Sequence, residues 1–118
     1  MKDRKVFQGG VYLVNLSPII GSEQGGTRPC VCVSNDRSNY CATTAQFVPL
    51  TTQLKTPIPT HHVLQQKDYS FLYKDSVVLG EQITTKSIKR VKSFLGRINS
   101  KDLDDIIKCI EIQFDIMI

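Results

Sequence analysis

Short apolar runs in which polar side chains alternate dominate this chain, and such runs predict β-strands. Turn-forming glycine, proline, asparagine and serine residues separate the runs. The expected strands lie at residues 11–16, 30–34, 45–51, 60–64, 76–85 and 88–98. Pro49 cannot donate a ladder hydrogen bond, so we expect a sheet edge, a bulge or a strand end close to it. Residues 35–39 form a polar turn whose Asn and Asp favour the start of a short helix.

A long helix is predicted only at the C-terminal end. Asn99 and Ser100 offer an N-cap, and three aspartates follow, whose negative charge complements the positive end of a helix dipole. The apolar residues of this segment keep a helical period: Leu103, Ile106, Ile107, Ile110 and Phe114. Several short strands with one terminal helix predict a mainly β fold, a small and strongly curved antiparallel sheet or barrel covered by the helix.

The length and composition predict one globular domain over residues 1–118. With 118 residues the chain buries a single core without staples, and 41% hydrophobic with 22% charged residues argues against disorder. No apolar run is long enough to span a bilayer, and the first residues are too polar for a secretory leader, so we expect a cytoplasmic protein without membrane contact.

The cysteine and histidine residues do not have the spacing of a metal site. Cys30 and Cys32 alternate along an expected strand and therefore share one face, whereas the other two cysteines stand alone. We expect buried, reduced thiols. His61 and His62 are adjacent, so a strand would point them to opposite faces, and we expect hydrogen-bonded structural histidines. No metal and no cofactor is implied.

The formal charge of +4 is unevenly distributed. Between residues 86 and 101 there are six basic residues and no acidic one, and the predicted helix that follows is rich in acidic residues. A basic face of this kind can attract a polyanion, although a solvated charged surface is the more common meaning of a charge run.

The chain is organised around residues 21–29, which read Gly-Ser-Glu-Gln-Gly-Gly-Thr-Arg-Pro. Gly25 and Gly26 permit positive φ and close backbone approach, and Pro29 fixes φ where the next strand begins, so Arg28 is expected at a loop-to-strand corner. Such a loop with one arginine is a candidate anion site, but it is more often an ordinary surface connection.

The sequence of this loop and of its flanks closely resembles the MazF/PemK family of toxin endoribonucleases. Before it stands Val-Tyr-Leu-Val-Asn-Leu-Ser-Pro, and after it Val-Cys-Val-Ser-Asn-Asp. Later family motifs are matched by residues 49–53 (Pro-Leu-Thr-Thr-Gln), 59–61 (Pro-Thr-His) and 75–83 (Asp-Ser-Val-Val-Leu-Gly-Glu-Gln-Ile). The resemblance covers roughly residues 8–115. It implies an SH3-like barrel with a C-terminal helix, a homodimer, and cleavage of single-stranded RNA without metal to a 2′,3′-cyclic phosphate and a 5′-hydroxyl.

The resemblance also implies which residues act on the RNA. The catalytic pair of the family corresponds to Arg28 and Thr51, and Thr52 takes the role of Thr51 if the strand register slips by one residue. A guanidinium grips two phosphate oxygens and stabilises phosphorane charge, but its pKa above about 12 makes it a poor proton acceptor. Glu23 is the candidate for that general base, with pairing to Arg28 or capping of the loop as the equally weighted alternative.

The remaining candidates for RNA binding carry amide and hydroxyl groups that can read base and sugar edges. They are Gln24, Thr27, Thr52, Gln53 and Gln82. Two positions depart from the family pattern: Gly10 stands where an acidic residue is common, and Thr84 where an arginine is common. The expected partners are single-stranded RNA and an acidic, partly disordered cognate antitoxin. The alternative is a non-catalytic toxin or binding module on the same barrel, such as a topoisomerase poison, because a fold does not fix a function.

Overall fold

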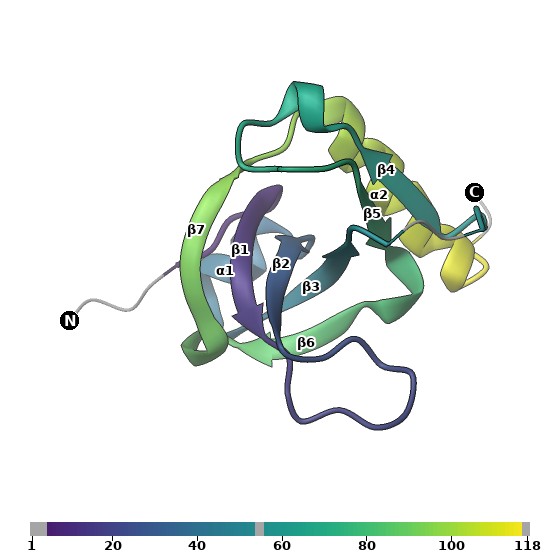
Figure 1. The fold of residues 1–118 in the computed structure, drawn as a ribbon. Helices are drawn as coiled ribbons and strands as arrows, with labels where there is room; N and C mark the ends of the chain where they lie inside the picture. The colour runs from purple at the N-terminus through teal and green to yellow at the C-terminus, as the bar shows by residue number, and fades with distance from the viewer. Residues whose placement is uncertain (1–4, 54–55, 117–118) are drawn as a thin grey trace.

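The computed structural model describes residues 5–53 and 56–116, so parts of the predicted 1–118 domain lie outside the described residues. They form an antiparallel sheet of seven strands and a C-terminal helix, α2 (Ser100–Gln113). The strands are β1 (Gly10–Asn15), β2 (Thr27–Cys32), β3 (Thr44–Thr51), β4 (His61–Leu64), β5 (Ser76–Leu79), β6 (Thr84–Ser87) and β7 (Val91–Arg97). The sheet order is β4-β5-β3-β2-β1-β7, with β6 also paired to β3. Figure 1 shows the sheet curving around a centre with α2 beside β4 and β5, which confirms the predicted mainly β fold with its curved, barrel-like sheet.

Strand β3 is the central element of the sheet and pairs with β2, β5 and β6. Pro49 lies where the pairing changes from β6 to β5. Its Phe47 pairs with Cys32 of β2 and with Thr84 of β6, and its Leu50 pairs with Val78 of β5. The pairing with β6 ends at Phe47 and that with β5 begins at Leu50. On this side of β3, Pro49 lies between the two pairings, so its missing N–H interrupts neither of them.

Two predicted long strands are wrong, because each contains a 3₁₀ turn. The first is interrupted at η2 (Gly80–Gln82), where Gly80 N–H donates to the Thr60 carbonyl at 2.9 Å. A Cβ on Gly80 would lie 2.6 Å from that oxygen, so only glycine permits this approach, and the chain turns between β5 and β6. The second begins as η3 (Ile88–Arg90), capped by the Ser87 hydroxyl, before β7 starts. The other expected strands appear, with boundaries shifted by up to three residues.

The helical predictions hold with one exception. Asn99 caps α2 by accepting a hydrogen bond from Asp102 N–H at 2.8 Å, and Asn35 caps the short helix α1 (Asp36–Cys41) in the same way through Ser38. Phe114 was expected on the buried face of the long helix, but it is 59% exposed. The helix ends at Gln113, and the turn at Phe114 points its ring to solvent.

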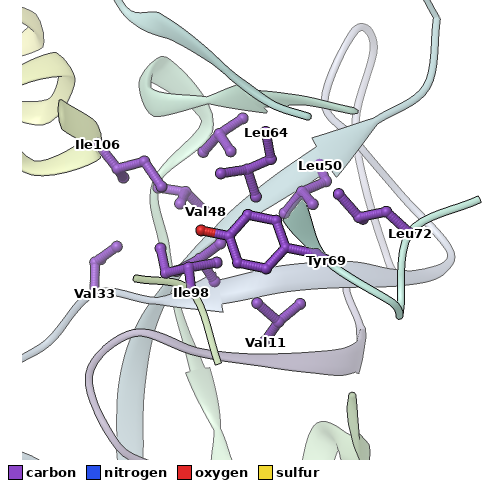
Figure 2. Close-up of a cluster of buried hydrophobic side chains, with 11 residues drawn as sticks. Val11, Val33, Val48, Leu50, Leu64, Tyr69, Leu72, Ile98 and Ile106 are labelled. Carbon is purple, nitrogen blue, oxygen red and sulfur yellow. The ribbon is translucent and has the colours of Figure 1, made fainter. Parts of the chain in front are cut away.

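Two clusters of buried apolar side chains occupy the two faces of the curved sheet. The first holds Val11, Val48, Leu50 and Ile106 of α2 (Figure 2). The second holds Tyr12, Val14, Cys30 and Phe47. The alternation of residues 11 and 12 between the clusters is the period of two expected of a strand buried on both faces.

The predicted buried thiols are found at three of four positions. Cys30, Cys32 and Cys109 are buried and free, and the first two share one cluster as their spacing predicts. Cys41 is exposed, because it ends the short helix α1 at the surface, so the expectation is wrong there. Among the described residues no helix is long and apolar enough to cross a membrane.

Candidate functional site

Two carbonyl groups hold the guanidinium of Arg28. Its Nε donates to the Gly25 carbonyl at 3.0 Å and its Nη1 donates to the Leu50 carbonyl at 3.4 Å. Gly26 has φ +72°, a conformation that glycine adopts without strain, and this turn brings the Gly25 carbonyl under the side chain. Arg28 lies one residue inside β2 instead of at the expected corner, with Val14 of β1 opposite. Its position is therefore fixed by a strand and by its own loop.

Thr51 lies on the strand next to Arg28. The pairs Cys30–Pro49, Val31–Val48 and Cys32–Phe47 define the β2–β3 register, and extending it by two residues places Thr51 opposite Arg28. Thr51 ends β3 and is buried, and its hydroxyl oxygen accepts from Gln53 N–H at 3.2 Å. That bond uses an oxygen lone pair and leaves the hydroxyl hydrogen available for donation.

Arg28 and Thr51 line one cavity of about 270 Å³. Thr52 and Gln53 line it too, so the structure brings four of the sequence candidates together. The described residues of its lining carry no carboxylate and no histidine: Arg28, Pro29, Leu50, Thr51, Thr52, Gln53, Phe71, Leu72, Tyr73 and Ser76. Arg28 is the single charged side chain among them, so an anion is the ligand that this cavity favours.

The sequence prediction missed the residues that the segment before β5 contributes. Phe71 packs against Gly96 of β7, where a Cβ would lie 2.5 Å from the ring, and Tyr73 is 75% exposed at the cavity. Tyr69, Phe71 and Tyr73 recur at every second position, although this segment forms turns in which Tyr69 is buried and Tyr73 is exposed. That spacing was the available signal, but it does not reveal which cavity the segment reaches.

The thiol nearest to Arg28 is not a nucleophile. Burial raises the pKa of Cys30 to about 12, although the positive charges of Arg28 and Lys86 oppose the rise. A thiol with this pKa is protonated at neutral pH and lacks the thiolate that nucleophilic attack requires.

Glu23, Gln24 and Gln82 line a second cavity, of about 460 Å³, with Glu81, Thr84 and Lys86 among its other residues. Neither Arg28 nor Thr51 belongs to it. Oε1 of Glu23 accepts from Ile20 N–H at 2.9 Å, which closes a turn within the β1–β2 loop. Oε1 of Gln82 accepts from Gln24 N–H at 3.4 Å and joins the loop to η2. Thr27, opposite Asn15 at the start of β2, is exposed and does not line either cavity.

Three of the six basic residues between 86 and 101 form hydrogen bonds or ion pairs through their side chains, and a fourth, Arg97, covers the Phe7 ring. Lys86 donates to the Leu16 carbonyl at 3.3 Å, and Arg90 donates to the carbonyls of Asn15 and Ser17. Both side chains therefore hold the beginning of the β1–β2 loop. Lys101 pairs with Asp105 at 3.2 Å on α2.

The histidines bond carboxylates on opposite faces of β4. Nε2 of His61 lies 3.2 Å from Glu81 Oε2, and Nε2 of His62 lies 2.8 Å from Asp102 Oδ1. His62, Asp102 and Asp105 bring ligand atoms within 4.8 Å of one another, the arrangement that a metal ion would need. Tyr69 O–H and Lys101 already bond the two aspartates, so these groups have the partners of a structural junction between β4 and α2.

The pKa of Glu81 is lowered by its hydrogen bonds. Burial raises its pKa, but hydrogen bonds from its own backbone N–H, from His61 and from Thr60 outweigh this and hold the pKa of Glu81 below its usual value. It is therefore ionised at neutral pH at the wall of the second cavity.

Comparison with known proteins identifies the family. Residues 7–114 match the model of the family described as PemK-like, MazF-like toxin of type II toxin-antitoxin systems. The chain belongs to this family. The match extends over almost the whole chain and agrees with the resemblance carried by the loop motif.

Solved structures share the fold at low identity. A MazF crystal structure from Deinococcus radiodurans has a TM-score of 0.83 at 23% identity, covering 97% of this chain and all of the other. An endoribonuclease in complex with its cognate antitoxin from a Mycobacterial species has a TM-score of 0.77 at 24% identity, covering 96% and 98%. A MazE–MazF structure from D. radiodurans has a TM-score of 0.76 at 21% identity, covering 98% and 100%. These likenesses establish the MazF fold for this chain.

The two departures from the MazF/PemK sequence pattern have structural settings. A Cβ on Gly10 would lie 2.7 Å from the Tyr12 ring and 3.0 Å from the Phe7 ring, so packed aromatic rings fill the space of an acidic side chain. Thr84 starts β6 and lines the cavity of Glu23, where a smaller, neutral side chain replaces a cation.

Proposed function

We propose that this family member is a sequence-specific endoribonuclease toxin that cleaves single-stranded RNA at the cavity of Arg28 and Thr51. The observation that carries the proposal is the meeting of these two side chains in one cavity, where the guanidinium is the single charge among the described lining residues. Neighbours with the same fold are described as endoribonucleases, and this supports the reaction class.

In the proposed reaction the RNA supplies its own nucleophile. The 2′-oxygen loses its proton to a base and forms a bond to phosphorus, the bond from phosphorus to the 5′-oxygen breaks, and that oxygen takes up a proton. The products are a 2′,3′-cyclic phosphate and a 5′-hydroxyl. Arg28 stabilises the charge on the phosphorane through those guanidinium N–H groups that Gly25 and Leu50 do not use.

Thr51 complements Arg28 as a neutral donor. Because its oxygen accepts from Gln53 N–H, the hydroxyl is oriented before substrate arrives, and its hydrogen can point to a non-bridging phosphate oxygen. A donor held in place in this way loses little entropy on binding. Metal-independent cleavage fits the same cavity, since its lining supplies a cation and hydroxyls in place of metal ligands.

The second cavity extends the proposed RNA path. Gln24, Gln82 and Lys86 offer amide and ammonium groups there, and Thr52 and Gln53 do so on the side of Arg28. Thr27 is proposed to contact the backbone from the exposed start of β2. Bases splayed on either side of the scissile phosphate would be read by these groups, as is usual for single-stranded RNA.

Glu23 remains the proposed acid–base candidate of the loop, but its contacts favour a positioning role. One carboxylate oxygen closes the turn at Ile20, and the side chain lines the neighbouring cavity. A general base must come within hydrogen-bond reach of the 2′-hydroxyl, directly or through one water. The observed contacts of Glu23 are explained by its ordering of the loop that carries Gly25. They do not bring its carboxylate to the 2′-hydroxyl.

The proposal includes the partners that the family description implies. We expect a homodimer in the cytoplasm, without membrane contact and without cofactor, that a cognate antitoxin neutralises. An acidic, partly disordered antitoxin would compete with RNA for the same positive charges. Related chains are described in complexes of MazE with MazF, which supports this pairing.

A cleavage assay on a long defined transcript tests the proposal. Wild-type protein should cut it with EDTA present, and mapping of the new 5′ ends should give one recurring sequence. Arg28→Ala should fold normally and lose cleavage by about a hundredfold or more. Thr51→Ala should lose about tenfold, with Thr51→Ser near wild type. Absence of cleavage by wild type would favour the non-catalytic binding module.

A further inference from the structure

Three aromatic rings meet at the surface between β1, β7 and the segment before β1. The ring of Phe94 lies 5.5 Å from that of Phe7 and 5.4 Å from that of Tyr12, measured between centroids, and Phe7 and Tyr12 lie 6.0 Å apart. Tyr12 is buried beneath the other two, and its hydroxyl accepts from Phe7 N–H at 3.2 Å. Phe94 is 54% exposed, so the cluster has a rigid base and one ring presented to solvent.

Positive charge surrounds these rings. A cavity of about 430 Å³ is lined by Lys5, Phe7, Tyr12, Lys92, Ser93 and Phe94. The guanidinium of Arg97 lies 4.1 Å from the Phe7 ring centroid and covers one of its faces. We call Arg97 and the six lining residues of this cavity the aromatic shelf. It shares no lining residue with the cavities of Arg28 and Glu23.

The charges of the shelf are available to a ligand. Among the ion pairs of the described residues, none involves Lys5, Lys92 or Arg97. Lys5 donates to the Tyr40 carbonyl at 2.8 Å, which leaves two of its N–H groups unused. The nearby acid, Asp36, accepts from Gln8 N–H at 2.7 Å, and its single negative charge leaves the cations in excess. The net character is therefore cationic and aromatic.

We infer that the aromatic shelf is a second binding site for single-stranded RNA, in which a base stacks on Phe94 and the flanking phosphates contact Lys5, Lys92 and Arg97. Stacking platforms bordered by cations are the common means of holding single strands without a sequence requirement. The inference rests on RNA being the substrate of the proposed function. It gives the enzyme an anchoring point for RNA outside the cleavage cavity.

A binding measurement with RNA that cannot be cut separates this inference from the cleavage proposal. The probe is a fluorescent 20-nucleotide oligouridine whose 2′-hydroxyls are methylated, and the protein is the full wild-type chain. Phe94→Leu keeps an apolar side chain but removes the stacking ring, and should weaken binding about five- to a hundredfold. Phe94→Tyr retains the ring and should bind within about twofold of wild type. Lys92→Gln should lower the slope of log affinity against log salt by about 0.7.

Phe114→Leu is the matched control, because Phe114 is exposed to a similar degree and lies at the other end of the chain. It should bind the probe as wild type does. Binding by Phe94→Leu equal to wild type would overturn the inference, because the aromatic ring would then contribute no stacking. A change of oligomeric state in Phe94→Leu, seen by gel filtration, would also overturn it and make the shelf an interface between copies.

Failure of the shelf and failure of the nuclease proposal give different results. If only the shelf inference is wrong, Phe94→Leu binds normally and wild type still cleaves a transcript in an Arg28-dependent manner. If only the cleavage proposal is wrong, wild type cuts nothing, yet the methylated probe still binds in a Phe94-dependent manner.

Discussion

The cavities of Arg28 and of Glu23 differ in how their polar groups are held. In the first, Arg28 and Thr51 lie on the neighbouring strands β2 and β3, and the guanidinium is fixed by carbonyls of its own loop and of β3. The second lies between the β1–β2 loop and η2, where Glu23 bonds its own loop and Gln82 contributes a long contact of 3.4 Å. The charged group of the first cavity is therefore fixed on a strand, and Glu23 of the second is fixed within a loop.

This difference suggests a separate role for each of the two cavities. A strand framework holds a group in place with the accuracy that transition-state stabilisation requires, whereas loops tolerate change and carry specificity. We therefore propose that the Arg28 cavity takes the scissile phosphate and that the Glu23 cavity reads bases beyond it. The assignment predicts large losses of rate on one side and modest changes of affinity on the other.

Arg28→Lys should give the largest loss of activity. A small loss would contradict the difference between the two cavities. A lysine keeps the positive charge but cannot span the Gly25 and Leu50 carbonyls and a phosphate with one planar group. We expect a loss of about a hundredfold in kcat, measured by single-turnover cleavage, with the thermal midpoint close to wild type. A near wild-type rate would show that charge alone suffices and that the fixed geometry is irrelevant.

Tyr73→Ala should cost about tenfold in kcat/KM on a short RNA containing the cleavage sequence, because an exposed ring at the Arg28 cavity can stack on a base. Tyr73→Phe should restore activity. Tyr40→Ala is the matched control, since Tyr40 is also 75% exposed but lies on α1. Equal losses in the two alanine variants would argue against stacking at the cavity.

Glu23→Gln should change activity only a few-fold, and mainly through KM. Glutamine keeps an oxygen that can accept from Ile20 N–H, so the loop stays ordered, but it cannot act as a general base. Kinetics across a pH series distinguishes the two roles. A fall in kcat of about a hundredfold or more, with loss of the acidic limb of the pH profile, would move Glu23 into the reaction itself.

The smallest effect is expected for stability against pH. The pKa of Glu81 is lowered in the folded state, so its bonds to His61 and Thr60 stabilise the fold above the ordinary glutamate pKa of about 4.3 and lose this contribution as the pH falls through the lowered value. Thermal unfolding of wild type and Glu81→Gln should therefore differ at neutral pH and converge in acid. A constant difference would contradict the assignment.

Sequence reasoning was sufficient where local patterns determine structure. The alternation of Val11 with Tyr12 and the cap at Asn99 are readable because they depend on neighbours in the chain. The pairing of Arg28 with Thr51 came from a family motif, not from periodicity, and the register of β2 and β3 places the two side chains opposite each other.

Long-range contacts were beyond such reasoning. The break at Gly80 follows from the approach of Thr60, twenty residues earlier in the chain. Phe114 lies outside the core because the helix ends at the residue before it. Tyr73 and Phe71 reach the Arg28 cavity only through the path of their loop across β7. The separation of Glu23 from Arg28 into two cavities likewise depends on where η2 closes against the loop.

The hydrogen bonds that Arg90 donates to the carbonyls of Asn15 and Ser17 affect how strongly RNA binding should depend on ionic strength. A cation held against backbone carbonyls is less free to neutralise an RNA phosphate, and a phosphate that is not neutralised keeps its condensed counterions. Counting basic residues in the sequence therefore overstates how steeply added salt should weaken RNA association, and a titration with potassium chloride should report fewer neutralised phosphates than the six cations of that stretch would imply.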